Sequence, residues 1–298
     1  VAIVPEGLPI ILVITLALGM RNMARHKAII RRMKAVETLG STTVIYSDKT
    51  GTLTKNQMTV RQLHTVDGFY SVTGDGFNPE GTLMQGEDKL DEDSMAKLQS
   101  NPGFRLLASC LSLCHNSQIS KQDNLWTAIG DPTDSACAVL GWKLNGDVRK
   151  FSQRHPRLHE FFFNTERKRM SVVHEYEGER WVFSKGAAGG FVPITTHRYQ
   201  KGELVEISDE DLKEASLRNE EMGSHSMRVI ALAARKLGAD EDFTDITVVE
   251  SNMIFLGLVG IMDPPRPEVK DAIRICQEAG IKVKIITGDH HLTAAAIG

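Results

Sequence analysis

The first 20 residues form the most apolar stretch of the chain, and Glu6 is the only charged residue among them. A membrane-spanning helix requires about 20 apolar residues, so the pattern predicts a membrane segment over residues 1–20. Pro5 and Pro9 remove backbone donors there and are expected to break the helix. An acid beside a broken membrane helix usually serves a function, so we interpret Glu6 as an ion ligand. A helix buried in a soluble core is the less favoured interpretation.

Shorter apolar runs predict strands near both ends of the remaining chain. Residues 42–47 are apolar and rich in β-branched side chains, and residues 254–261 and 281–286 form similar runs. Residues 267–279 have a helical pattern that ends at Gly280. The order strand, helix, strand is typical of a parallel α/β sheet, so we expect this architecture at both ends.

The middle of the chain, from about residue 60 to 250, mixes short alternating runs with polar turns. This pattern predicts an inserted α+β domain rather than a continuation of the parallel sheet. The elements expected within it are helices over 104–115 and 134–144, a hairpin over 172–184, and a charged helix over 209–222 that is capped by Ser208.

Charge changes this picture directly after the apolar stretch. A basic cluster follows there, made of Arg21, Arg25, Lys27, Arg31, Arg32 and Lys34. Basic residues flank membrane spans on the cytoplasmic side, so the chain after about residue 21 is predicted to be cytoplasmic. The whole chain has a net charge of −3, which gives no basic footprint for nucleic acid.

Two of the four cysteines, Cys110 and Cys114, lie near His115 in the sequence and could form part of a metal site. A zinc site would need a second ligand pair at suitable spacing, and the sequence offers none. Buried, reduced thiols on one helix are therefore the favoured interpretation.

Candidate chemistry lies where two predicted strands end, because Asp48 and Thr287 each follow a strand directly. Ligands of open parallel sheets bind at the carboxyl ends of strands, and an aspartate there can attack a phosphoryl group to form an acyl-phosphate. Lys49 adds positive charge, and the residues up to Thr52 offer donors for phosphate oxygens. A carboxylate that attacks ATP needs Mg²⁺ to neutralise those oxygens. The residue types alone leave open that Asp48 starts a turn or caps a helix.

Short motifs along the chain favour the first interpretation. Residues 48–54 read DKTGTLT and resemble the phosphorylation signature of P-type cation-transporting ATPases. Residues 5–9 (PEGLP), 185–187 (KGA), 263–266 (DPPR) and 287–289 (TGD) resemble further motifs of the calcium-pump-like branch, in the same order. The resemblance implies an α/β fold, in which a Rossmann-like phosphorylation domain of the haloacid-dehalogenase type carries an inserted α+β nucleotide-binding domain.

The resemblance also implies a division of the chain. A transmembrane helix segment would occupy 1–20, the stalk and first part of the phosphorylation domain 21–59, the nucleotide-binding domain 60–250, and the second part of the phosphorylation domain 251–298. The family pattern places an actuator domain before Val1 and a magnesium motif after Gly298. We therefore expect the phosphorylation domain to be incomplete, and the chain alone neither to transport ions nor to turn over an acyl-phosphate.

For catalysis, the resemblance identifies Asp48 as the residue that ATP phosphorylates. Related phosphatases carry an acid two residues after the nucleophile, whereas Thr50 stands here and cannot act as a strong base. This suits an acyl-phosphate that must persist until transport. Asp48 and the Thr50 carbonyl are implied to hold Mg²⁺, so the implied cofactors are ATP and Mg²⁺. The implied catalytic residues are Asp48, Lys49, Thr50, Thr287, Gly288 and Asp289.

For the base of the nucleotide, Phe163 matches the family phenylalanine that stacks on adenine, and an aromatic face suits a purine. Core packing is the simpler interpretation for at least one of Phe161, Phe162 and Phe163. Asp134 stands where the family usually has glutamate, and this shorter acid is implied to lie near the adenine.

For the phosphates, Lys168 and Lys185 match lysines that line the ATP pocket of the family, and Arg228 matches an arginine nearby. Residues 188–190 read AGG where the family commonly has Pro-Glu after KGA, so the loop itself departs from the pattern. The implied nucleotide-binding residues are Asp134, Phe163, Lys168, Lys185, Gly186, Arg228, Asp263 and Arg266.

For the transported ion, Glu6 matches a cation-binding glutamate, and the carbonyls of Val1, Ala2 and Val4 are implied to join it. Calcium prefers several oxygen ligands of this kind and is the leading candidate, ahead of sodium, potassium and manganese. The implied partners are that cation, ATP and the membrane lipid around residues 1–20. A membrane-tethered nucleotide-binding module without catalysis is the alternative, and Thr50 and Glu6 argue against a soluble phosphatase.

Overall fold

The computed structural model describes residues 7–287. These residues form two compact units, a smaller one with residues 7–48 and 267–286, and a larger one with residues 49–266. The chain therefore enters the larger unit after Asp48 and leaves it after Arg266, so the larger unit is an insertion between the two segments of the smaller one.

The smaller unit consists of two N-terminal helices and a two-stranded sheet. Its elements are α1 (Leu8–Arg25), α2 (Met33–Gly40), β1 (Val44–Asp48), α9 (Val269–Glu278) and β15 (Lys282–Ile286). β1 and β15 are parallel, and their register runs from Val44↔Lys282 to Asp48↔Ile286. The predicted strands 42–47 and 281–286 and the helix 267–279 are thus confirmed within two residues at each end.

Helix α1 is long and apolar enough to cross a membrane by length and composition. It has 18 residues with a mean hydropathy of 1.4, and none of its side chains is buried. The helix begins after Gly7, and Pro9 stands in its first turn, where a missing N–H costs no helical hydrogen bond. The break expected at Pro5 falls outside the described residues.

An eleven-stranded sheet forms the centre of the larger unit. Its main path runs β5-β4-β3-β2-β14-β13-β10-β9-β8, and β11 pairs with β14 in parallel while all other pairs are antiparallel. The strands of this sheet are β2 (Thr59–Thr65), β3 (Gly68–Val72), β4 (Leu83–Gln85), β5 (Asp88–Lys89), β8 (Arg157–Asn164), β9 (Arg169–Tyr176), β10 (Glu179–Gly186), β11 (Thr195–Gln200), β12 (Glu203–Glu206), β13 (Arg228–Lys236) and β14 (Met253–Met262).

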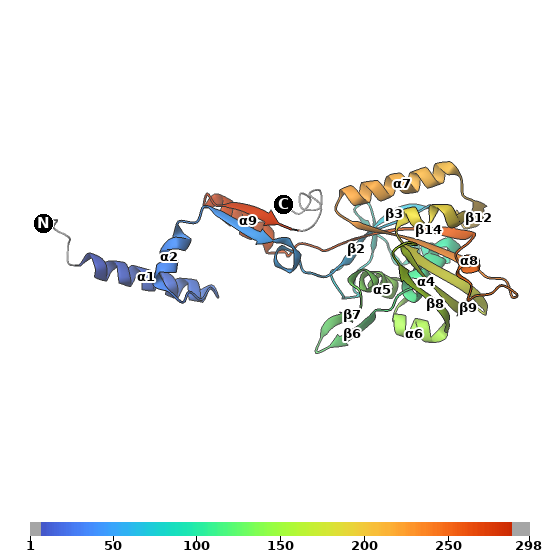
Figure 1. Cartoon of the computed structure of the whole chain (residues 1–298), viewed down its shortest axis with the longest axis horizontal. Helices are drawn as coiled ribbons and strands as arrows, with labels where there is room; N and C mark the ends of the chain where they lie inside the picture. The colour runs from blue at the N-terminus through green and yellow to red at the C-terminus, as the bar shows by residue number, and fades with distance from the viewer. Residues whose placement is uncertain (1–6, 288–298) are drawn as a thin grey trace. The chain divides into compact units, whose positions relative to one another are not determined.

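Helices cover both faces of this sheet. In Figure 1, α7 (Asp209–Ser224) lies on one face, and α4 (Pro102–Leu113), α5 (Pro132–Asn145) and α6 (Val148–Arg154) lie on the other. The remaining elements are α3 (Glu92–Ser100), α8 (Ile246–Val249), the hairpin β6 (Gln118–Gln122) and β7 (Leu125–Ile129), and the short turns η1 (Lys49–Leu53), η2 (Ala188–Gly190) and η3 (Val192–Ile194).

The central strands are apolar on both faces because each face has a core of its own. Neighbouring residues alternate between these cores, so that Val172 packs with α4 and α5 while Val173 packs with Met222 of α7.

The predicted hairpin 172–184 is confirmed as β9 and β10, and Gly178 at its tip has a φ of 79°. The predicted helix 209–222 is confirmed as α7, and Ser208 forms its capping box with Asp211.

The predicted fold class is confirmed, but one strand belongs to a different sheet than the pattern implied. Residues 254–261 form a strand, β14, which pairs with β2 and β13 in the larger unit rather than with β1. The units therefore divide after Arg266 instead of at 250/251. A central antiparallel strand with a core on each face has the same continuous apolar run as a parallel strand, so its sequence does not distinguish the two.

Candidate nucleotide-binding site

The larger unit contains a pocket of about 760 Å³ at the edge where β10 ends and β13 begins. This volume is within the range of small-molecule and cofactor sites, about 300–1,000 Å³. The lining comes from β8, the turn before β9 and the start of that strand, the end of β10, the starts of β13 and α5, and the segment after α4. The lining residues are Asn116, Asp131, Thr133, Asp134, Phe162, Phe163, Lys168, Met170, Lys185, Gly186, Ala187, Arg228, Val229 and Ile230.

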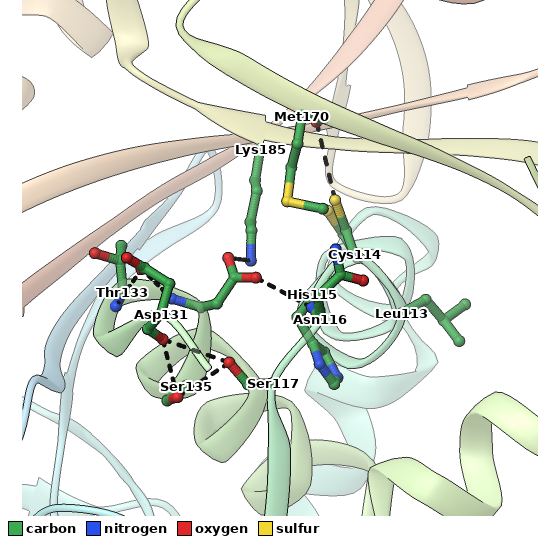
Figure 2. A network of polar contacts seen from close by, with 12 residues as sticks. Leu113, Cys114, His115, Asn116, Ser117, Asp131, Thr133, Ser135, Met170 and Lys185 are labelled. Atoms are coloured by element: carbon green, nitrogen blue, oxygen red, sulfur yellow. Dashed lines mark hydrogen bonds and ion pairs between the residues drawn. The ribbon is translucent and has the colours of Figure 1, made fainter. Parts of the chain in front are cut away.

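An ion pair between Lys185 and Asp134 forms the floor of this pocket. The Lys185 Nζ lies 2.5 Å from Asp134 Oδ1, and only 5% of the lysine is exposed. Figure 2 shows the Lys185 side chain extending from the sheet toward the residues around the start of α5. The second carboxylate oxygen, Asp134 Oδ2, accepts the backbone N–H of Asn116 at 3.1 Å. Both oxygens of this acid are therefore engaged by the protein.

The two partners of this pair hold each other in the charged form. Burial alone would raise the pKa of Asp134, but the ammonium of Lys185 outweighs it and lowers the pKa below its ordinary value. Burial alone would lower the pKa of Lys185, but the Cys137 thiol and the Asp134 carboxylate raise it. Burial raises the pKa of Cys137 to about 11, so this thiol is neutral at pH 7 and the carboxylate supports the ammonium. The pocket floor is therefore a pair of opposite charges rather than a neutral amine and acid.

The N-terminus of α5 forms one wall of the pocket. Asp131 caps the helix, and its Oδ1 accepts the backbone N–H groups of Thr133 at 2.8 Å and Asp134 at 3.1 Å. From the opposite wall, Arg228 Nη1 donates to Thr133 Oγ1 at 2.7 Å. An arginine and a helix N-terminus, which both favour anions, therefore meet across the pocket.

Two phenylalanines with exposed rings form a second wall. Phe162 is 70% exposed and Phe163 is 60% exposed, although large apolar side chains are normally covered in a folded domain. Phe161 differs, because it packs against the core beneath α7. The prediction that at least one of these rings serves the core is confirmed for Phe161.

Close backbone packing holds Lys168 against the KGA segment that follows Lys185. Lys168 has a φ of 52°, and its carbonyl accepts the N–H of Ala187 at 2.9 Å. A Cβ at Gly186 would collide with the Lys168 carbonyl oxygen and with Arg169, so only glycine fits at this position. The glycine of the KGA motif therefore lets the two lysine-bearing segments touch.

Comparison with known proteins identifies the family to which this site belongs. A family model described as "P-type ATPase, cytoplasmic domain N" matches residues 103–268, which include every residue that lines the pocket. The chain belongs to the P-type ATPase family. The resemblance inferred from the motifs is thereby confirmed.

Several P-type ATPases are similar to the chain over its whole length. They include "Calcium-transporting ATPase" of Bacillus subtilis (38% identity, 33% of its length), "Cation-transporting ATPase pma1" of Synechocystis (37%, 32%) and "Calcium-transporting ATPase type 2C member 1" of Bos taurus (37%, 29%). The chain therefore spans about a third of the length of these relatives.

Two residues predicted to serve this P-type ATPase in nucleotide binding, Asp263 and Arg266, do not line the pocket. Asp263 accepts a hydrogen bond from Thr54 Oγ1 at 2.5 Å, and Arg266 Nε donates to the Thr54 carbonyl at 3.1 Å. Arg266 Nη2 also donates to the Gly51 carbonyl at 3.0 Å. The DPPR motif thus binds the segment that carries the DKTGTLT signature, and its predicted contact with nucleotide gains no support from the pocket.

The phosphorylation signature begins at the end of a strand, as its sequence predicted. Asp48 is the last residue of β1 and is exposed, and the chain turns immediately afterwards through η1, where Gly51 has a φ of 75°. Lys49 is buried and Thr50 is exposed. Thr287 follows β15 directly. The predicted site residues Val1, Ala2, Val4, Glu6, Gly288 and Asp289 lie outside the described residues.

The sequence reasoning missed several residues of the pocket. Asn116 and Met170 contribute to the lining, and so do Val229 and Ile230 beside Arg228. The neighbours of the assigned residues were the available signal, since Val229 and Ile230 follow Arg228 directly and Met170 lies two residues after Lys168. Cys110 and Cys114 are buried as expected, and residues 7–287 hold no group of three or more His, Cys, Asp or Glu able to bind a metal.

Proposed function

We propose that the larger unit binds ATP in the pocket between α5, β8, β10 and β13. The observation that carries this proposal is one pocket that joins the exposed Phe163 ring with the cations of Lys168, Lys185 and Arg228. An exposed aromatic face suits the adenine base, and the cations suit the phosphates. The buried Asp134 partner keeps Lys185 charged without placing a second cation beside it.

Titration with ATP tests this proposal on the 298-residue chain. Phe163→Ala and Lys168→Ala should each weaken ATP binding about tenfold, because a stacking partner or a phosphate contact is lost. Lys150→Ala is the matched control, since Lys150 is an exposed lysine on α6 that does not line the pocket. Equal affinity for all four proteins would overturn the proposal.

We further propose that Asp48 accepts the γ-phosphoryl group of ATP. A carboxylate oxygen of Asp48 would bond to the γ-phosphorus while the bond from this phosphorus to the β,γ-bridging oxygen breaks, and ADP leaves with that oxygen. Mg²⁺ binds proteins through one or two hard oxygens together with substrate phosphates. Asp48 and the Thr50 carbonyl are donors of this kind, so they would hold Mg²⁺, which neutralises phosphate charge. Thr50 supplies no strong base to hydrolyse the acyl-phosphate.

For the protein as a whole, we propose an ATP-driven cation pump that moves calcium across a membrane. Two kinds of support exist: the relatives in Bacillus subtilis and Bos taurus are named calcium-transporting ATPases, and α1 is long and apolar enough to cross a membrane. The described chain after α1 would then face the cytoplasm, where ATP is available. Glu6 remains the proposed cation ligand within the chain.

A chimeric pump tests the transport proposal. The 298 residues would replace the matching segment of the Bacillus subtilis relative, and calcium uptake into vesicles would be measured with ATP. We expect uptake and an acid-stable phosphoprotein, and Asp48→Asn should abolish both. A chimera that binds ATP but forms no phosphoprotein would favour the alternative, a nucleotide-binding module without catalysis. Uptake of manganese but not calcium would replace the proposed ion.

A further inference from the structure

A buried carboxylate lies outside the nucleotide pocket and has no part in the function proposed so far. Glu250 follows α8 and precedes β14, is 6% exposed and does not line the pocket. It forms ion pairs with Arg167 Nη1 and with Arg169 Nε, the latter at 2.7 Å, and Ser171 Oγ donates to its Oε1 at 2.7 Å. A buried carboxylate persists only with such partners, so these contacts define one fixed arrangement.

The partners of Glu250 alternate with residues of the pocket. Arg167, Arg169 and Ser171 reach Glu250, whereas Lys168 and Met170 line the pocket. Arg169, Met170 and Ser171 are successive residues of β9, whose side chains point alternately to opposite sides, while Arg167 and Lys168 belong to the turn before it. Glu250 therefore holds β9 and the turn that bears Lys168 from the side opposite Met170.

The two arginines carry this hold to the other pocket segments. Arg167 Nη2 donates to the Phe162 carbonyl at 2.8 Å, and Arg169 Nη1 donates to the Gly190 carbonyl at 2.7 Å. The first bond fixes the backbone that bears the exposed phenylalanines. The second fixes the loop that follows the KGA motif, where this chain departs from the family pattern. One carboxylate thus connects the backbone of Phe162, which lines the pocket, with the loop after the KGA motif.

We propose that Glu250 is a positioning residue for nucleotide binding. It orients Arg167 and Arg169 so that the turn before β9 and the loop after β10 stay in contact, and so that Lys168 faces the nucleotide. This inference rests on the proposed ATP site. Glu250 does not touch the nucleotide, and its effect is transmitted through the two guanidinium groups.

Binding and hydrogen exchange test this role on the 298-residue chain. Glu250→Gln keeps the shape of the side chain but loses its charge, and we expect about tenfold weaker ATP binding, because small displacements at a site reduce its function strongly. Backbone amides of 164–170 and 187–190 should exchange faster without nucleotide, and those of α7 should not. Glu241→Gln is the control, since Glu241 also pairs with an arginine, Arg235, away from the pocket. It should leave ATP affinity within twofold.

A double-mutant cycle separates positioning from general stability. If Glu250 acts through Lys168, Glu250→Gln should cost little further affinity in the Lys168→Ala background. Arg169→Lys provides a second variant that keeps the charge beside Glu250 but loses the planar fork that reaches Gly190, and it should speed exchange at 187–190. Additive losses in the cycle, or unchanged ATP affinity in Glu250→Gln, would overturn the proposal. Failure of the unmodified chain to bind ATP would instead refute the proposed function, while faster exchange in Glu250→Gln would still show the hold on the two segments.

Discussion

The two units of the chain differ in how much of their apolar surface they cover themselves. The larger unit has a core on each face of its sheet, and side chains such as Leu107 and Phe183 are completely buried. In the smaller unit, α1 and α2 bury no side chain, and Tyr46 and Ile286 of the two-stranded sheet are 67% and 58% exposed. Parallel sheets are normally covered on both faces, so this sheet differs from the usual pattern.

This difference separates the two proposed chemical steps. Every residue that lines the nucleotide pocket belongs to the larger unit, and the pocket floor is a buried ion pair within it. Asp48, in contrast, stands exposed at the end of the thinly covered sheet. We therefore expect nucleotide binding to be a property of the larger unit alone, and phosphoryl transfer to require more than the described chain supplies.

Removing core volume should give the largest difference between the units. Leu107→Ala should lower the free energy of unfolding of the larger unit by about 2–5 kcal/mol, because a fully buried leucine leaves a cavity in packed surroundings. Ile45→Ala in β1 should cost under about 1 kcal/mol, since Ile45 is already 37% exposed. Urea denaturation followed by circular dichroism measures both. Similar losses for the two variants would show that the smaller unit has a core of comparable quality.

Adding ATP should stabilise only one of the units. At a hundred times its dissociation constant, a ligand stabilises the folded state by about 2.7 kcal/mol. Hydrogen exchange should therefore slow at the end of β10 and at the starts of β13 and α5, while amides of β1 and β15 keep their rates. Protection of β1 to the same degree would mean that the nucleotide couples the units, and the comparison would then have to be abandoned.

The sequence predicted this division unevenly, for physical reasons. Motifs with fixed residue types located Asp48, Lys185 and Arg228, and strand and helix patterns located β1, α7 and the β9–β10 hairpin. The sheet to which β14 belongs was predicted wrongly, because an apolar run does not indicate which strands it pairs with. Long-range pairing is decided by the two cores, which no local pattern describes.

The nucleotide site shows the same limit at the level of side chains. The acid at position 134 was predicted from its place in a motif. Its ion pair with Lys185 joins two segments that are about fifty residues apart in the sequence, so no local pattern indicates it. Glu250 was not predicted at all, because an acid before a strand resembles an ordinary surface residue until its arginines are known. Roles that depend on distant partners therefore needed the structure.

Acidification should weaken the larger unit through a histidine in its sheet. Burial lowers the pKa of His174 to about 4, and Nε2 of this fully buried ring has no partner among the described residues. Between pH 4 and 6.5 the folded state binds fewer protons than the unfolded one, so the stability is present above 6.5 and is lost as pH falls. From pH 7 to 5 the loss is about 2 kcal/mol. His174→Gln should reduce the pH dependence of the free energy of unfolding, measured by urea titration, by this amount. His225→Gln, at an exposed position, should leave that pH dependence unchanged.

The smallest expected effect concerns the face of the larger unit opposite α4 and α5. In the capping box of α7, Ser208 Oγ accepts the Asp211 N–H at 3.3 Å. Ser208→Ala removes this acceptor and should lower the free energy of unfolding by about 1 kcal/mol. ATP affinity should stay within twofold, because neither residue lines the pocket. Paired urea and ATP titrations check both quantities. If loss of the cap also weakened ATP binding, the face covered by α7 would be coupled to the pocket through the shared sheet, and the larger unit would have to be treated as one cooperative element.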